Sequence, residues 1–162
     1  MAFEGTDALL ARTRDFITDH RTVYLGSGGR QGHIVDFRHA GARGLLPSLL
    51  LRTEGRRSGA ARIVPLIYGL WGDEWVVVAS KGGAPEHPHW FLNLTARPDC
   101  QLQVATQAFR ANWRVAAGAE RTQVWSYMSH VYPPYAQYQV AAQDREIPVV
   151  LLKPIAPIAG FT

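Results

Sequence analysis

Short apolar runs separated by turns rich in glycine and proline occupy most of the 162-residue chain, a pattern typical of β structure. The runs predict strands over residues 48–53, 61–70, 75–80, 99–106, 108–117 and 147–154, with a shorter strand over 33–37. Pro65 lies inside the run 61–70, and proline cannot donate to a sheet ladder, so this strand is expected at an edge or a bulge. The rest of the glycine-rich stretch 26–44 predicts a loop.

Apolar residues recur at helical spacing in three places, residues 7–20, 89–96 and 119–131. Thr6 is the predicted N-cap of the first helix. The apolar face of that helix consists of Leu9, Leu10, Thr13, Phe16 and Ile17. Two consecutive prolines within residues 131–138 end the third helix.

The order of these elements lacks the regular alternation of strand and helix that a doubly wound sheet requires. We therefore predict a mainly β (α+β) fold: a small closed or partly closed β-barrel with an N-terminal helix and two further helices packed on it. The length favours a single domain, with the N-terminal helix and glycine-rich loop in residues 1–44 and the barrel in residues 45–162.

Composition narrows the class of protein. Hydrophobic residues make up 47% and charged residues 19%, which is ordinary for a globular domain. No stretch approaches the ~20 apolar residues of a membrane-spanning helix, and the first thirty residues do not have the pattern of a secretory signal. The single cysteine, Cys100, excludes an internal disulfide and a cysteine-rich metal centre, and a cytoplasmic protein is expected. His87 and His89 flank Pro88 without an evident third ligand, so no metal site is predicted.

The net charge of +4 is concentrated locally: six arginines and one glutamate lie between positions 38 and 62. An anionic partner is indicated, which composition alone leaves open as a nucleic acid, a membrane surface or a small anion. Within this stretch Arg56 and Arg57 form the turn GRRSG, and Arg62 follows. A tight turn that exposes backbone amides beside guanidinium forks suits a phosphate or carboxylate. The alternative is a solvated turn whose charges protect a sheet edge.

Ser80, Lys81, Gly82 and Gly83 directly follow a hydrophobic strand. This end of a strand offers a hydroxyl, an ammonium and free backbone amides, which suits a planar anionic ligand; the alternative is a simple loop. The spacing differs from that of a phosphate-binding P-loop.

Tyr132, Tyr135 and Tyr138 recur at spacing three in the segment YPPYAQY. They predict either a flexible aromatic wall over a flat substrate, with phenols that donate hydrogen bonds or protons, or ordinary core packing. No GxSxG motif is present, and Cys100 lies in a predicted strand without a partner, so covalent catalysis is not indicated.

Four blocks of sequence together resemble the deazaflavin-dependent nitroreductase and F420H2-dependent quinone reductase family of actinobacteria. They are TEGRRSGAARIVPLIYG, VVVASKGGAPEHPHWFLNL and VYPPYAQYQ with DREIPVVLLKP. The resemblance covers roughly Leu49 to Pro154 and implies an FMN-binding-like split β-barrel that binds coenzyme F420. It implies that the phosphate and polyglutamate tail of the cofactor lies along Arg56, Arg57, Ser58 and Arg62. It implies that the deazaflavin ring lies against Val64, Pro65, Ala79, Ser80, Lys81, Gly82 and Gly83, near Trp90.

The same resemblance implies hydride transfer from the reduced ring to a quinone or a nitroaromatic held by Tyr132, Tyr135, Tyr138 and Ser80. A deazaflavin carries the hydride chemistry itself, which agrees with the lack of a catalytic triad or metal set. The chain departs from the family at Arg57, where lysine is common, at the apolar Val64 and Ile67, and in residues 33–43.

Alternatives remain open at this point. An FMN enzyme of the pyridoxamine-phosphate-oxidase type shares the fold, and a non-catalytic F420 carrier would share the motifs. Nucleic-acid binding is not favoured, because no known motif matches. The apolar face of residues 7–20 could make peripheral contact with the inner leaflet of a membrane, and the chain is expected to be a monomer or a homodimer.

Overall fold

The structure, a computed structural model, describes residues 13–162. Its helices are α2 (Thr13–Gly26), α3 (His89–Ala96), α4 (Gly118–Val131) and α5 (Pro134–Ala142), with short 3-10 turns η1 (Arg38–Ala40) and η2 (Lys81–Gly83). Its strands are β1 (Ile34–Asp36), β2 (Leu45–Glu54), β3 (Ala61–Ile67), β4 (Gly69–Trp71), β5 (Glu74–Val78), β6 (Cys100–Val104), β7 (Gln107–Val115) and β8 (Val149–Ile158).

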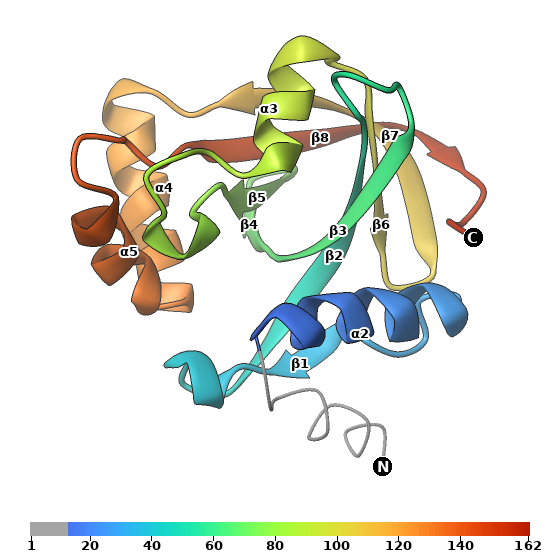
Figure 1. Cartoon of the computed structure of the whole chain (residues 1–162), viewed down its shortest axis with the longest axis horizontal. Coiled ribbons are helices and arrows are strands. Elements are labelled where there is room, and N and C mark those ends of the chain that lie inside the picture. Colours follow the sequence, from blue (N-terminus) through green and yellow to red (C-terminus); the bar gives the residue numbers. More distant parts are fainter. Residues whose placement is uncertain (1–12) are drawn as a thin grey trace.

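All strand pairs are antiparallel, in the order β1-β2-β6-β7-β8-β5-β4, with β3 paired to β2. The sheet curls so that β3 comes close to β5. In Figure 1, α3 lies above the place where these two strands meet, and α4 and α5 lie to one side of it. The prediction of a mainly β, partly closed barrel is confirmed. Within the described residues β3 pairs only with β2, which also confirms the edge position expected from Pro65.

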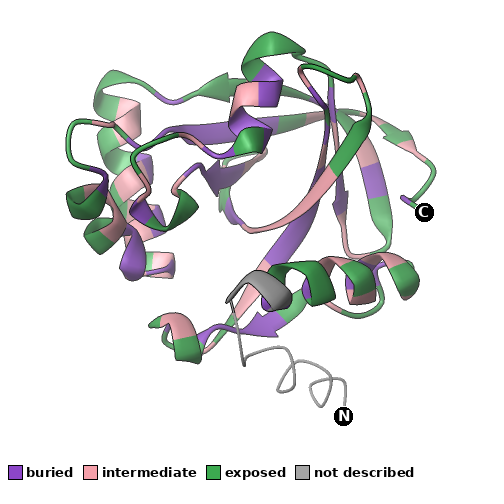
Figure 2. Ribbon diagram, in the orientation of Figure 1, coloured by how far each residue is buried: buried purple, intermediate pink, exposed green. Residues whose placement is uncertain are grey.

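The centre of the sheet is buried on both faces, as Figure 2 shows along β2 and β8. Leu49, Leu50 and Leu51 are consecutive and fully buried, which requires cover on both sides of β2. One apolar cluster lies between the sheet and the α4–α5 pair, and a second lies between the sheet and α3. These clusters hold the helices that position the site.

Helix α3 has the bounds that the sequence predicts. Pro88 precedes it with extended backbone and Arg97 ends it, followed by a second proline. Trp90, Phe91 and Leu94 are buried in the second cluster. This packing fixes the first turn of α3 beside β3.

The segment after α4 differs from the prediction. Helix α4 ends at Val131 as expected, but a further helix, α5, begins at Pro134. Proline is favoured in the first turn of a helix, because its missing N–H would be unpaired there anyway. The expectation of only two helices after the first was therefore one helix short, and residues 134–138 are helical.

Helix α2 continues to Gly26, six residues beyond the predicted end. Among its residues 16–26 the buried side chains are those of Phe16, His20 and Tyr24, which recur at spacing four. Ile17, predicted on the buried face, is 43% exposed, so that part of the prediction was wrong. Thr6, Leu9 and Leu10 lie outside the described residues.

Two strand boundaries also differ. Strand β2 begins at Leu45, three residues before the predicted start at residue 48, because this segment pairs with β1. Pro47 therefore lies inside the strand. The predicted strand 61–70 is interrupted at Tyr68, which separates β3 from β4.

Candidate functional site

A groove of about 620 Å³ lies between β3, the turn that precedes it, η2 and the first turns of α3. This volume is in the usual range for a site that takes a small molecule. The groove is lined by Gly55, Arg56, Arg57, Ser58, Arg62, Ile63, Val64, Lys81, Pro88, His89, Trp90 and Asn93. Seven predicted site residues therefore meet in one place: Arg56, Arg57, Ser58, Arg62, Val64, Lys81 and Trp90.

The basic turn (residues 55–59) closes on itself. The amide of Gly55 donates to the carbonyl of Ala60 at 2.7 Å, and the amide of Gly59 donates to the carbonyl of Gly55 at 2.7 Å. Gly59 has φ +72°, a conformation that glycine adopts readily. Arg57 and Arg62 are exposed and have no hydrogen-bond or ion-pair partner among residues 13–162. Their charge is available to an external anion.

Asn93, which the sequence pattern did not predict as a site residue, attaches this turn to α3. It is only 3% exposed, and its Oδ1 accepts from the backbone N–H of Arg56 at 3.2 Å and from Nη1 of Arg56 at 3.0 Å. Its Nδ2 donates to Oγ1 of Thr53 at 3.3 Å. The guanidinium of Arg56 also lies 3.3 Å from Nδ1 of His89. The available signal was a single polar residue in the apolar run WFLNL.

The Lys81 loop (residues 79–87) leaves β5 with an unusual backbone. Lys81, Gly82 and Gly83 have φ values of +47°, +62° and +83°. At Gly83 a side chain is excluded, because a Cβ would lie 2.6 Å from the carbonyl oxygen of Tyr138 in α5. Nζ of Lys81 contacts Oε1 of Glu86 at 2.8 Å, and this contact lowers the pKa of the Glu86 carboxyl.

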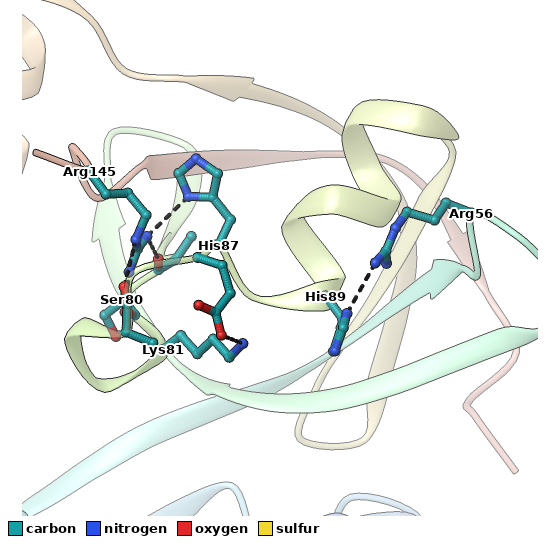
Figure 3. A network of polar contacts seen from close by, with 9 residues as sticks. Arg56, Ser80, Lys81, His87, His89 and Arg145 are labelled. Atoms are coloured by element: carbon teal, nitrogen blue, oxygen red, sulfur yellow. Dashed lines mark hydrogen bonds and ion pairs between the residues drawn. The ribbon is translucent and has the colours of Figure 1, made fainter. Parts of the chain in front are cut away.

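Arg145, also not predicted from the sequence pattern, contacts the Lys81 loop from the segment after α5. Its guanidinium donates to the carbonyls of Ala79 at 3.1 Å, Ser80 at 2.7 Å and Ala84 at 2.9 Å. It also lies 3.0 Å from Nδ1 of His87 (Figure 3). No local pattern could have revealed these contacts, because Arg145 is 58 to 66 positions away from them.

The remaining predicted ring-binding residues lie beside the groove without lining it. Ala79 is fully buried in the second apolar cluster, and Pro65 is half-buried on β3. Ser80, Gly82 and Gly83 belong to the Lys81 loop, so they adjoin the residue that reaches the groove.

The three tyrosines belong to the first apolar cluster and not to the lining of the groove. Tyr132 and Tyr135 are 5% and 4% exposed, and Tyr138 is half-buried. The hydroxyls of Tyr132 and Tyr138 lie 3.1 Å apart. Burial raises the pKa of Tyr132 and of Tyr135 well above the ordinary value of 10, so both are neutral hydrogen-bonding groups. The backbone of Tyr138 packs on Gly83, which places α5 behind the Lys81 loop.

Other chemistries find little support in the described residues. Within residues 13–162 no group of three or more His, Cys, Asp or Glu side chains could hold a metal ion, and no helix is long and apolar enough to cross a membrane. Cys100 is buried, its Sγ lies 3.4 Å from the carbonyl of Ala111, and burial raises its pKa to about 12. It is a poor nucleophile for this reason.

Comparison with known proteins bears on both the fold and the groove. The family model for F420H(2)-dependent quinone reductase matches residues 20–154. The chain is 34% identical over 136 residues to the F420H(2)-dependent quinone reductase Rv1261c of Mycobacterium tuberculosis, with 82% of this chain and 86% of that protein covered.

Two solved structures are similar in fold and sequence. One, described as F420-H2 dependent reductase FDR-A, has a TM-score of 0.60 at 38% identity and covers 66% of this chain and 94% of that chain. Another, described as a domain-swapped dimer, has a TM-score of 0.63 at 33% identity and covers 88% of this chain and 100% of that chain. The split-β-barrel fold is thereby confirmed. The matched residues include the basic turn, the Lys81 loop and Arg145, and the chain belongs to the F420H(2)-dependent quinone reductase family.

Proposed function

We propose that this chain is an F420H2-dependent reductase that passes a hydride to a quinone. The observation that carries the proposal is the composition of the groove. It combines exposed arginines that have no anionic partner among residues 13–162, apolar walls at Val64 and Trp90, and the ammonium of Lys81. Arg56 and Lys81 lie on opposite sides of His89 (Figure 3), so an elongated anionic ligand could contact both.

The donor set fits the cofactor. The tail of F420 is a chain of phosphate and carboxylate groups, and planar guanidinium forks bind such groups in a bidentate manner. Arg57 and Arg62 are exposed and unpaired within the part of the chain that the structure describes, and the backbone and side chain of Arg56 are oriented by Asn93. Ser58 adds a hydroxyl in the same turn. We assign the tail to these four residues.

The ring is assigned to the apolar part of the groove. Val64 and Trp90 supply flat apolar surface, and Pro65, Ala79, Ser80, Gly82 and Gly83 adjoin it. When bound, reduced F420 supplies a hydride from C5 of its ring, and a quinone that accepts it also needs a proton to become a hydroquinone. Lys81 is placed to offset negative charge on the bound molecules.

The acceptor is assigned to Ser80 and Tyr138, the two partly exposed members of the predicted set, while the buried Tyr132 and Tyr135 pack against Tyr138. Tyr138 is the most exposed of the three tyrosines, and its hydroxyl is within hydrogen-bond distance of Tyr132. If Tyr132 donates to Tyr138, the Tyr138 O–H is free to donate to a quinone oxygen as negative charge develops there.

Anaerobic titration with reduced F420, followed by addition of quinones or nitroaromatics, tests the proposal. We expect saturable binding that FMN does not displace and recovery of the absorbance of oxidised F420 when quinone is added. Preference for FMN, or no binding of F420 by folded protein, would overturn it. Tyr138→Phe is expected to lower kcat for quinone while F420 binding is retained; unchanged kcat would remove Tyr138 from the assignment.

A further inference from the structure

We propose that Arg145 is a positioning residue for the cofactor: it holds the Lys81 loop in the conformation that brings Lys81 to the groove. Arg145 does not line the groove and is not among the residues predicted to bind the cofactor. The inference rests on the proposed function, because it concerns the binding of F420.

The contacts of Arg145 span the whole loop. Ala79 and Ser80 lie before the left-handed residues, and Ala84 and His87 lie after them. A single planar guanidinium therefore ties the two ends of the loop together, as Figure 3 shows. The fork geometry of arginine suits this task, because its N–H groups point in several fixed directions.

The backbone between these two ends is disfavoured by itself. Lys81 has a Cβ and nevertheless adopts φ +47°, a region that residues other than glycine rarely occupy. Such conformations persist where the surrounding structure over-determines them, and they are common at ligand sites. Arg145 on one side and Tyr138 of α5 on the other supply that constraint.

The charge of Arg145 supports the same role. Its partners are three carbonyls and an imidazole, and no carboxylate within the described residues lies in ion-pair distance of it. Glu86, which contacts Lys81, interacts with Arg145 electrostatically from beyond ion-pair distance. Arg145 adds positive charge behind the loop that carries Lys81, which favours an anion in the groove.

Arg121 provides a matched control. It is also partly buried, it donates to the carbonyl of Ile147 at 2.8 Å, and it contacts Glu146 at 2.6 Å. It therefore holds the segment that follows Arg145 without any contact to the Lys81 loop. If Arg145 only stabilised the fold, Arg121→Ala and Arg145→Ala would have similar effects on stability and on F420 binding.

The first experiment measures the Kd for F420 in the full chain. Arg145→Ala is expected to weaken binding about tenfold, Arg121→Ala to leave it within about twofold, and Arg145→Lys to lie between, since one ammonium cannot reach all four partners.

Because Arg145 acts through Lys81, adding Arg145→Ala to Lys81→Ala should weaken F420 binding little further. Unchanged binding in Arg145→Ala, or full additivity with Lys81→Ala, would overturn the proposal. Arg145→Gln replaces the alanine variant if that variant does not fold.

The second experiment does not need the cofactor. The chain has two lysines: Lys81 lies in the loop, whereas Lys153 lies inside the paired strand β8, where a protease gains access only after larger unfolding. Cleavage of the native protein by endoproteinase Lys-C therefore reports opening of the loop at Lys81. We expect Arg145→Ala to be cut about tenfold faster than the wild type and Arg121→Ala to be cut at the wild-type rate.

The two readouts separate the possible failures. If the wild type does not bind F420, the proposed function fails, and proteolysis still decides whether Arg145 holds the loop. If F420 binds and Arg145→Ala opens the loop without weakening binding, the positioning role fails while the proposed function stands. Equal cleavage of the Arg145→Ala and Arg121→Ala variants would also overturn the proposal.

Discussion

The basic turn and the tyrosines of α4 and α5 both look functional in the sequence, yet the fold treats them in opposite ways. Arg57 and Arg62 are exposed and have no protein partner among the described residues, whereas Tyr132 and Tyr135 are buried against other rings. Exposed charged side chains without a protein partner are free to bind an external molecule, whereas side chains packed in a core stabilise one another. The difference predicts that mutations in the turn will affect binding and that mutations of the tyrosines will first affect stability.

The largest expected effect tests the tyrosine side. Tyr135→Ala removes a buried ring that packs on Tyr132 at 4.8 Å between centroids, so it should cost about 3–5 kcal/mol of unfolding free energy. Tyr135→Phe keeps the ring and serves as the control, with a change below about 1 kcal/mol. Urea unfolding measures both. A small loss in the alanine variant would show that this region is not part of the core.

The basic turn should behave in the opposite way. The double variant Arg57→Ala/Arg62→Ala is expected to weaken F420 binding about a hundredfold, because two charge-assisted contacts to the tail are lost. Its melting temperature should stay within a few degrees of the wild type, since neither side chain has a partner within residues 13–162. Arg110→Ala removes an exposed arginine from β7, away from the groove, and is the charge control for calorimetric titration. An equal loss of F420 affinity in Arg110→Ala would show that the effect comes from net charge and not from contacts in the groove.

Asn93 shares features of both regions, because its side chain is buried but its hydrogen bonds hold Arg56 in the basic turn. Asn93→Asp would place a carboxylate against Arg56, which should neutralise part of the cationic site and weaken F420 binding about tenfold. The new ion pair offsets part of the cost of burial, so the fold should survive. Binding equal to that of the wild type would mean that Arg56 does not contact the tail.

How much of the fold and of the candidate site the sequence could predict depends on how far apart in the chain the responsible residues lie. The bounds of α3 follow from Pro88 and from Arg97 with its following proline, and the basic turn follows from glycines at both its ends; both causes lie within a few residues. Helix α5 was missed because YPPY reads as a break, although Pro134 suits a first turn. Asn93 and Arg145 act on partners 37 to 66 positions away, so only the folded chain reveals them.

Acid should destabilise the packed side of the molecule. Burial lowers the pKa of His20 below its ordinary value of 6.5, although the hydrogen bond to Gly32 acts in the other direction. The unfolded chain therefore binds a proton at His20 more readily than the folded chain. Stability is highest above pH 6.5 and falls as the pH drops toward the folded-state pKa, by at most about 1.4 kcal/mol per pH unit for each such histidine.

Burial lowers the pKa of His33 and His87 as well, so the three histidines add in the same direction. Urea unfolding at about pH 7.5 and about pH 5.5 measures the slope, which His20→Gln should flatten. A slope that His20→Gln leaves unchanged would contradict the assignment.

The smallest expected effect lies at the contact between Lys81 and Glu86. This ion pair is exposed, and such pairs contribute about 0–1 kcal/mol. An anion in the groove must compete with Glu86 for the ammonium, so Glu86→Gln should tighten F420 binding by about two- to fivefold without a measurable change in unfolding. Glu54→Gln, which breaks the exposed contact with Arg97 outside the groove, is the control and should leave the Kd unchanged. Weaker binding in Glu86→Gln would show that Glu86 assists the cofactor site. In that case the cofactor and the Glu86 carboxylate would not compete for the ammonium of Lys81.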